Sequence, residues 1–403
     1  MPYGRAVVFL PCVWRRRMTG TAITPSRAEF IELAKLHTVV PVWTQILADL
    51  ETPVAAFIKL VGDDDGFLLE SVEHGERWSR YSFVGRNPRG TLTLRNGVLT
   101  VSGDVPASVP LDKGMLAAME ELLRIYRAPL FPDLPPLQGG LMGHLGYDVV
   151  REIEDLPNVP RDDRDLPDAS ISIIGSLAAF DHWRQRVYML ESVPVAGLTD
   201  AQIGVAYDAA VTRVHEAVAD LARPLAYVAV EPPVAGENLP KTRSSMPDGQ
   251  YRSAVDVAKE YIRAGDIFQV VLSQRFDIDL TADPFDVYRV LRQVNPSPYM
   301  YFLRQPDLTI VGGSPEPLVQ LVNGRVVSRP IAGTRKRGVD DEHDKRLAGE
   351  LRENPKEVAE HIMLVDLARN DVGRVSTFGS VQMDELMTLE RYSHVMHLTS
   401  QVS

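Results

Sequence analysis

Two glutamates, Glu357 and Glu360, stand three residues apart in the segment ENPKEVAEHIMLVDLARNDVGR, ahead of an apolar stripe. Positions i and i+3 of a helix share one face, so the two carboxylates would lie side by side. Such carboxylates repel each other, and an inward-facing pair therefore needs a cation or a shared proton. The pattern predicts a metal site at the edge of a buried core. A solvated first helical turn, whose acids suit the helix N-terminus, explains it equally well.

Magnesium is the metal that this pair favours. It commonly takes one or two protein carboxylates and completes its shell with water and an anionic substrate. The segment RPIAGTRKRG, residues 329–338, could hold the anion. Gly333 lets a ligand approach the backbone, Thr334 offers a hydroxyl and an N–H, and the basic residues around them favour negative charge. Taken in isolation, a solvated basic loop is the simpler explanation of this segment.

Three further polar residues are candidates for chemistry. His394 and His397 form an H-x-x-H pattern, but zinc normally needs a third protein ligand and the chain has one cysteine. His394 is therefore better explained as a hydrogen-bonded core residue. His397 could carry a proton, because the ordinary pKa of imidazole suits work near neutral pH. Gln269 lies in an expected strand, where a glutamine usually points outward.

The composition excludes several classes of protein. The chain has 403 residues, of which 45% are hydrophobic and 24% charged, as in soluble globular proteins of two domains or two lobes. The net charge of -11 argues against a nucleic-acid partner, which needs a basic face. The single cysteine allows no internal disulfide and fits a cytoplasmic location. No apolar run reaches the roughly 18 residues of a membrane span.

Two low-complexity stretches suggest the domain boundaries. In residues 1–17 three arginines, Arg15 to Arg17, follow the apolar run VVFLPCVW. A secretory signal has its positive charges before the apolar run, so we expect a disordered or artefactual leader instead. Proline, glycine, serine and charge dominate residues 231–250. We therefore predict an N-terminal region over 18–235, a linker over 236–250 and a second domain over 251–403.

The periodicity predicts an α+β protein with mainly antiparallel sheets, because most strands are joined by hairpins and the helices come in blocks. Helices are expected over 26–37, 114–126, 199–221, 251–263, 285–294 and from about Pro355 onward. Strands are expected over 67–71, 80–85, 91–101 (a hairpin turning at Asn96-Gly97), 171–191 (two strands), 269–280, 299–304, 308–312 and 318–322.

Long segments of the chain resemble a known family. PIAGTRKRG, PKEVAEHIMLVDLARNDVGRV and LERYSHVMHLTSQV together resemble the chorismate-utilising enzymes. FLLES, GDIFQVVLSQRF and NPSPYMYF make the resemblance close to the anthranilate synthase component I family, from about residue 25 to the end. The resemblance implies stacked antiparallel sheets flanked by helices. It also implies a lyase that turns chorismate and ammonia into anthranilate and pyruvate with Mg²⁺, the first step of tryptophan biosynthesis.

The resemblance also implies roles for matching residues. Glu360 corresponds to the direct Mg²⁺ ligand and Glu357 to its water-mediated neighbour. Gly333 and Thr334 correspond to the chorismate-binding pair, and His397 to the histidine linked to proton transfer during elimination of pyruvate.

Two positions separate the chain from related enzymes. Ala332 stands where aminodeoxychorismate synthases often carry a nucleophilic lysine, and Gln269 stands where water-using isochorismate and salicylate synthases carry a general-base lysine. The resemblance therefore favours ammonia as the external nucleophile.

The same resemblance implies a feedback site for tryptophan. Glu70 and Ser71 would meet the polar groups of the inhibitor, and Pro298, Tyr299 and Met300 would line the site. Without the resemblance, these segments are a strand end and a proline-rich turn, and nothing else in the sequence brings them together.

The expected partner is a glutamine amidotransferase subunit, in a heterotetramer, because the chain lacks a cysteine nucleophile in a triad context that could release ammonia from glutamine. Members of the family continue for roughly another hundred residues, so the resemblance implies a C-terminally truncated chain that alone would hold the metal poorly. Two alternatives stay open: a truncated non-catalytic tryptophan-binding or regulatory protein, and another chorismate enzyme, either an aminodeoxychorismate or an isochorismate/salicylate synthase.

Overall fold

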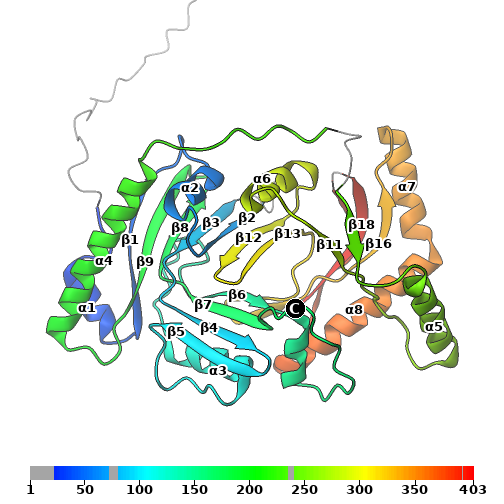
Figure 1. Ribbon diagram of the computed structural model, residues 1–403, viewed down its shortest axis with the longest axis horizontal. Coiled ribbons are helices and arrows are strands. Elements are labelled where there is room, and N and C mark those ends of the chain that lie inside the picture. The colour runs from blue at the N-terminus through cyan, green and yellow to red at the C-terminus, as the bar shows by residue number, and fades with distance from the viewer. Residues whose placement is uncertain (1–21, 72–79, 235–239, 393) are drawn as a thin grey trace, which may run out of the picture. The chain divides into compact units, whose positions relative to one another are not determined.

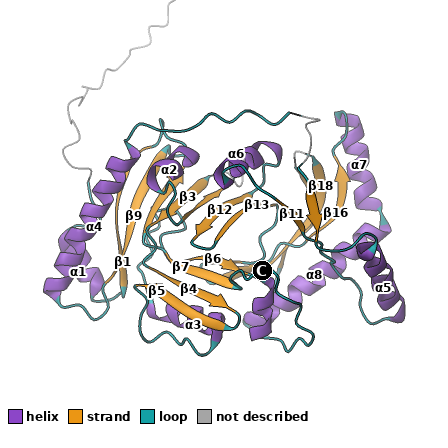
Figure 2. Ribbon diagram, viewed as in Figure 1, coloured by secondary structure: helices purple, strands orange, loops and turns teal. Residues whose placement is uncertain are grey.

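The computed structural model describes residues 22–71, 80–234, 240–392 and 394–403 (Figures 1 and 2). The expected leader, residues 1–17, lies outside the described residues, as do residues 236–239 of the expected linker. The chain forms two compact units, Met1–Tyr227 with Leu291–Ser403, and Val228–Val290. The predicted functional division at residues 236–250 stays a prediction.

A seven-stranded antiparallel sheet in the first unit combines five strands from residues 39–194 with two from residues 299–314 (Figure 1). The strand order is β1-β9-β8-β3-β2-β12-β13. Their bounds are β1 (Val39–Leu47), β2 (Gly66–Glu70), β3 (Tyr81–Arg86), β8 (Ser176–Asp181), β9 (Arg186–Pro194), β12 (Tyr299–Gln305) and β13 (Leu308–Ser314). The predicted α+β class with antiparallel sheets is confirmed.

Helices cover this sheet where its strands are most apolar. All six residues of β8 are buried, which fits its nearly uninterrupted small and apolar sequence. Helices α1 (Arg27–Ala34) and α4 (Asp200–Leu221) pack on β1 and β9, and α2 (Pro53–Leu60) packs on β2 and β3. The start of α1 is a capping box, since Ser26 and Glu29 bond each other's backbone N–H groups.

A second sheet, of four strands in the order β5-β4-β7-β6, packs against helix α3. The elements are β4 (Gly90–Arg95), β5 (Val98–Gly103), β6 (Leu141–Leu145), β7 (Ala169–Ile173), α3 (Gly114–Ile125) and the 3₁₀ helix η1 (Tyr147–Glu152). The predicted hairpin at Asn96-Gly97 is confirmed, and both residues have positive φ, 51° and 74°, as a two-residue hairpin of this type requires.

The prediction of two strands over residues 171–191 was incomplete. The chain leaves the second sheet after β7 and enters the first sheet at β8, so this stretch contributes to both sheets. Gly175 stands at the crossing, where a Cβ would lie 2.1 Å from the carbonyl oxygen of Asn87. Only glycine lets the two backbone segments approach so closely.

A third sheet, in the order β16-β18-β17, carries two helices on its surface. The elements are β16 (Ile331–Lys336), β17 (Met383–Arg391), β18 (Val395–Val402), α7 (Asp341–Glu353) and α8 (Pro355–Val375), with a separate hairpin of β14 (Gln320–Val322) and β15 (Arg325–Val327). Sequence analysis missed α7. Its signal is Asp340, which caps the helix by accepting from the N–H of His343 at 2.8 Å, ahead of an acidic first turn.

The second unit consists of β10 (Thr242–Ser244), α5 (Gln250–Ala264), β11 (Phe276–Ile278) and the beginning of α6 (Pro284–Val294). The predicted strand over 269–280 was wrong in extent, because β11 pairs only with the short β10. Gln269 lies exposed in irregular backbone. Among the described residues, no helix combines the length and the apolar character that crossing a membrane requires.

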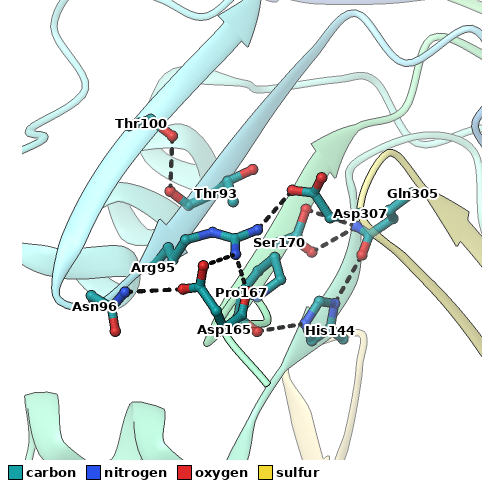
Figure 3. Close-up of polar contacts among 10 residues, drawn as sticks. All are labelled: Thr93, Arg95, Asn96, Thr100, His144, Asp165, Pro167, Ser170, Gln305 and Asp307. Atoms are coloured by element: carbon teal, nitrogen blue, oxygen red, sulfur yellow. Dashed lines mark hydrogen bonds and ion pairs between the residues drawn. The ribbon is translucent and has the colours of Figure 1, made fainter. Parts of the chain in front are cut away.

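A polar cluster ties the end of β12 to the second sheet (Figure 3). The buried Gln305 amide donates to the carbonyl oxygen of Ser170 at 3.1 Å and to its hydroxyl at 2.9 Å. Its oxygen lies 2.9 Å from Nδ1 of His144, which must donate because an amide oxygen only accepts. Asp307, in the turn after β12, meets Arg95 of β4 at 2.8 Å near the surface.

This cluster predicts unequal effects of two substitutions. Gln305→Leu should lower the free energy of unfolding by about 1–3 kcal/mol, because it removes the amide that bonds the buried Ser170 and Nδ1 of the half-buried His144. Asp307→Asn should change it by less than about 1 kcal/mol, because the ion pair is exposed. Urea denaturation followed by circular dichroism measures both. Equal stability of the Gln305→Leu variant and the parent would show that the amide does not hold the sheets together.

Candidate active site

A bulge in β16 shapes the candidate site. The pairing of β16 with β18 shifts register between Ala332 and Thr334, so Gly333 stands out of the ladder. Gly333 has a φ of +76°, and a Cβ there would lie 3.1 Å from a methyl of Leu351 and 3.4 Å from Oε2 of Glu357. Both its conformation and its contacts therefore require glycine. The bulge brings the backbone of β16 directly against the first turn of α8.

Beyond the bulge, Thr334 lies opposite His397 of β18. Nδ1 of His397 is 3.0 Å from the Thr334 hydroxyl and 3.3 Å from the carbonyl oxygen of Gly333. A carbonyl oxygen only accepts, so the Gly333 contact assigns the proton to Nδ1 and leaves Nε2 as the acceptor of the neutral ring. The ring of Tyr392 packs edge-on against His397 with centroids 5.5 Å apart.

The two glutamates occupy the first turns of α8. Asn354 begins the helix by accepting from the N–H groups of Lys356 and Glu357, and proline follows at the first helical position. Glu357 is 14% exposed and accepts from Arg335 of β16 at 3.1 Å. Glu360 is 29% exposed and lies 3.1 Å from the ammonium of Lys356. The two glutamates raise the pKa of Lys356, through the hydrogen bond of Glu360 first.

The donor set suits magnesium better than a metal held by protein alone. The described residues contain no group of three or more His, Cys, Asp or Glu side chains placed to hold a metal. Two carboxylates on adjacent turns nevertheless match the usual protein share of a Mg²⁺ shell, in which water and substrate supply the rest. Arg335 pairs with Glu357 and Lys356 pairs with Glu360, so these two side chains now supply the positive charge that a metal ion would supply.

The basic segment after Gly333 differs from the solvated loop that its sequence suggests. Residues Ile331–Lys336 form β16. Three cations follow Gly333 in the sequence, and two of them are paired with carboxylates. Arg335 bonds Glu357, whereas Arg337 bonds Asp344 at 2.7 Å. Asp344 also accepts from Arg391 at 2.9 Å, and its two guanidinium partners hold the pKa of that carboxyl far below its usual range. Lys336 is the exposed cation of the segment.

The structure brings together the five residues predicted for the inhibitor site. β2 pairs with β12, and Met300 lies opposite Glu70. Glu70 is buried, and Arg292 approaches its carboxylate at 2.7 Å and 2.9 Å. The next residue, Ser71, has a buried hydroxyl without a hydrogen-bond partner among the described residues. Pro298 and Tyr299 stand at the start of β12, where the Tyr299 hydroxyl accepts from Gln320 at 3.2 Å.

Glu390 and Tyr392 gave no signal in the sequence, but hydrogen bonds connect them to Arg329, the first residue of the basic segment. Arg329 bonds Glu390, and the Tyr392 hydroxyl donates to the same carboxylate at 2.8 Å. Burial raises the pKa of Tyr299, and the nearby Arg329 opposes that rise. These residues therefore connect the surroundings of Tyr299 with those of His397. Gln269 belongs to the second unit, so its place relative to this site stays a prediction.

Because of the bulge, alanine substitution should have different effects at two glycines that share the same φ, Gly333 and Gly324. Gly324, at the β14–β15 turn, also has a φ of +76°, but a Cβ there would meet nothing within 4 Å. Alanine at either position should lower the free energy of unfolding by about 1–2 kcal/mol through backbone strain. Only Gly333→Ala should also shift the ring ¹⁵N resonances of His397 in NMR spectra, because it crowds Glu357 and Leu351. Equal spectra for the two variants would refute this role of the bulge.

Comparison with known proteins gives consistent matches. The family model described as "chorismate binding enzyme" matches residues 70–403. Anthranilate synthase component 1 of Mycolicibacterium smegmatis is 42% identical over 96% of this chain and 76% of its own, and that of Thermus thermophilus is 46% identical over 88% and 73%. The crystal structure of anthranilate synthase component I from Streptococcus pneumoniae matches with a TM-score of 0.66 and 33% identity, over 89% of this chain and 75% of that one.

Proposed function

We propose a reaction for this chain from one premise: the chain belongs to the family of chorismate binding enzymes, among the anthranilate synthase component 1 proteins. The reaction is the conversion of chorismate and ammonia to anthranilate and pyruvate, the first step of tryptophan biosynthesis. The observation that carries it is the Thr334–His397 pair beside the Gly333 bulge, with Glu357 above the same strand.

The chemistry has two stages. Ammonia forms a bond to a ring carbon of chorismate while the 4-hydroxyl leaves, which gives aminodeoxyisochorismate. Loss of a ring proton and of the enolpyruvyl group as pyruvate then makes the ring aromatic. A site for this reaction must hold the ring carboxylate, stabilise the departing hydroxyl and accept one ring proton.

The residues on β16 and β18 suit two of these tasks. The backbone at Gly333 and the hydroxyl of Thr334 would hold the substrate, because the bulge leaves no side chain in the way. With its proton on Nδ1, His397 offers Nε2 to take the ring proton during elimination of pyruvate. The edge contact with Tyr392 fixes the plane of the imidazole.

Magnesium is proposed as the cofactor. Glu360 would bind it directly and Glu357 through water, and the ion would supply positive charge to the ring carboxylate and the departing hydroxyl. Arg335 and Lys356, which now lie against these carboxylates, would have to share them with the ion.

Ammonia is proposed as the nucleophile because the chain lacks the lysines of its relatives at Ala332 and Gln269. Component 1 implies a second component, and we propose that it is a glutamine amidotransferase subunit that supplies ammonia within a heterotetramer. The proposed location of this lyase is the cytoplasm.

Tryptophan is proposed as the feedback inhibitor. Its ammonium group would meet Glu70 and the Ser71 hydroxyl, which has no hydrogen-bond partner in the described part of the chain, and its ring would lie against Pro298, Tyr299 and Met300. The pairing of β2 with β12, which holds these five residues together, supports the proposal.

The activity is tested with chorismate, an ammonium salt and Mg²⁺. The expected result is equal amounts of anthranilate, followed by fluorescence, and pyruvate, followed by a coupled dehydrogenase. Glu360→Gln should raise the Mg²⁺ concentration for half-maximal rate at least about tenfold, the effect of losing one charged ligand contact. Lys345→Gln, an exposed substitution on α7, is the matched control. Pyruvate without anthranilate, or chorismate binding without turnover, would contradict the proposed reaction.

Feedback inhibition is tested at Ser71. Ser71→Ala should raise the tryptophan concentration for half-maximal inhibition about tenfold, because one hydrogen bond to a charged ammonium is lost. The rate without tryptophan should stay unchanged. Ser102→Ala, on exposed β5, is the control. If the Ser71 variant were half-inhibited at the same tryptophan concentration as the parent, Ser71 would not belong to the inhibitor site.

A further inference from the structure

A cavity lies in the first unit, lined by residues that belong to neither candidate site. It has a volume of about 240 Å³ and lies among β1, β9, the end of β7 and the segment that follows α3. Its wall includes Pro41, Arg89, Tyr126, Gln138, Gly140 and Ile173. None of its lining residues belongs to the chorismate or the tryptophan site proposed above.

The size of the cavity limits its occupant to a small molecule. An apolar cavity of about 150 Å³ holds one benzene ring in other proteins, so about 240 Å³ suits a single ring with one short substituent. Most of the wall is apolar and stiff, with four prolines at Pro41, Pro129, Pro136 and Pro194. A flat hydrocarbon ring fits such a wall without ordering flexible side chains.

One end of the cavity carries a guanidinium group fixed in place. Nε of Arg89 donates to the carbonyl oxygen of Ser192 at 2.7 Å, and Nη2 lies 3.2 Å from the Glu191 carboxylate. Glu191 is also bonded by Arg213 and by Ser176, so it does not depend on Arg89 alone. Nη1 of Arg89 makes no hydrogen bond to any residue in the described part of the chain, and the side chain is 18% exposed.

Tyr126 also lines the cavity and carries a second donor, its hydroxyl. Its hydroxyl makes no hydrogen bond within the described ranges, although the residue is half-buried. Burial raises the pKa of Tyr126, with help from the Asp104 carboxylate, so the phenol keeps its proton at neutral pH. A guanidinium N–H and a phenol O–H beside an apolar space together match a carboxylate attached to a ring.

A pair of glycines, Gly139 and Gly140, also lines the cavity. Gly139 and Gly140 have φ of +155° and +117°, which L side chains rarely adopt. A Cβ on Gly139 would lie 2.8 Å from the Ser192 hydroxyl, whereas one on Gly140 would meet nothing within 4 Å. The space beside Gly140 is thus open, as a ligand site requires.

We propose that this cavity is a second ligand site, which binds a single-ring aromatic carboxylate of the benzoate class. The ring lies among the prolines and Ile173, and the carboxylate accepts from Nη1 of Arg89 and the hydroxyl of Tyr126. The site is independent of the reaction proposed for β16 and β18, since it needs neither turnover nor Mg²⁺.

The experiment uses the full chain without Mg²⁺ and benzoate as the probe, with binding measured by calorimetry and ligand-observed NMR. We expect saturable binding in the millimolar range or tighter, with benzamide about tenfold weaker because it lacks the charge. Ala128→Trp fills the exposed mouth of the cavity and should abolish binding. Leu123→Trp, on the 61% exposed outer face of α3, should leave it intact.

Further variants separate this site from the others. Tyr126→Phe should weaken benzoate about tenfold while the chain stays folded, because it removes one hydroxyl. Absence of saturable binding, or binding that survives Ala128→Trp, would overturn the proposal. Binding lost in His397→Ala but kept in Ala128→Trp would place benzoate in the candidate active site and would equally overturn it. Equal affinity for benzamide would refute the role of Arg89.

Discussion

The pairing of β2 with β12 is the interaction on which the rest of the first unit depends. It joins Gly66–Glu70 to Tyr299–Gln305, strands far apart in the sequence, within a single antiparallel sheet. Glu70 and Met300 thereby become neighbours, and Gln305 at the other end of β12 reaches the second sheet. Closing so long a loop costs entropy that only extensive burial can offset. The nearly continuous apolar strands β8 and β9, which lie beyond β3 in the same sheet, contribute to that burial.

Local signals were sufficient for much of the fold. Asn96-Gly97 fixed its hairpin, and Ser26 with Glu29 fixed the start of α1, because the physics of a turn or a cap is contained in a few adjacent residues. The i, i+3 spacing likewise put Glu357 and Glu360 on the first turns of one helix. The strand predicted at 269–280 failed because a strand needs a partner, and periodicity says nothing of partners.

The environment of the candidate site was beyond the reach of sequence reasoning. The spacing of Glu357 predicted a cation beside it, yet the cation in the structure is Arg335, which a bulge in another element brings there. The same bulge turns the carbonyl of Gly333 toward His397 and so selects its tautomer. Such assignments depend on the register of β16 against β18, and a slip of one residue would reverse every side chain of the strand.

The two proposed sites share a structural connection that makes feedback physically reasonable. Tyr299 heads β12 beside Met300, and Gln320 and the nearby Arg329 surround its hydroxyl. Arg329 bonds Glu390, which accepts from Tyr392, whose ring packs on His397. The positive charge of Arg329 acts on the Tyr299 hydroxyl, so we infer that a ligand that moves Tyr299 changes the electrostatic surroundings of Arg329. Because packed, hydrogen-bonded groups have few alternative arrangements, we infer that such a change reaches the imidazole as an altered orientation.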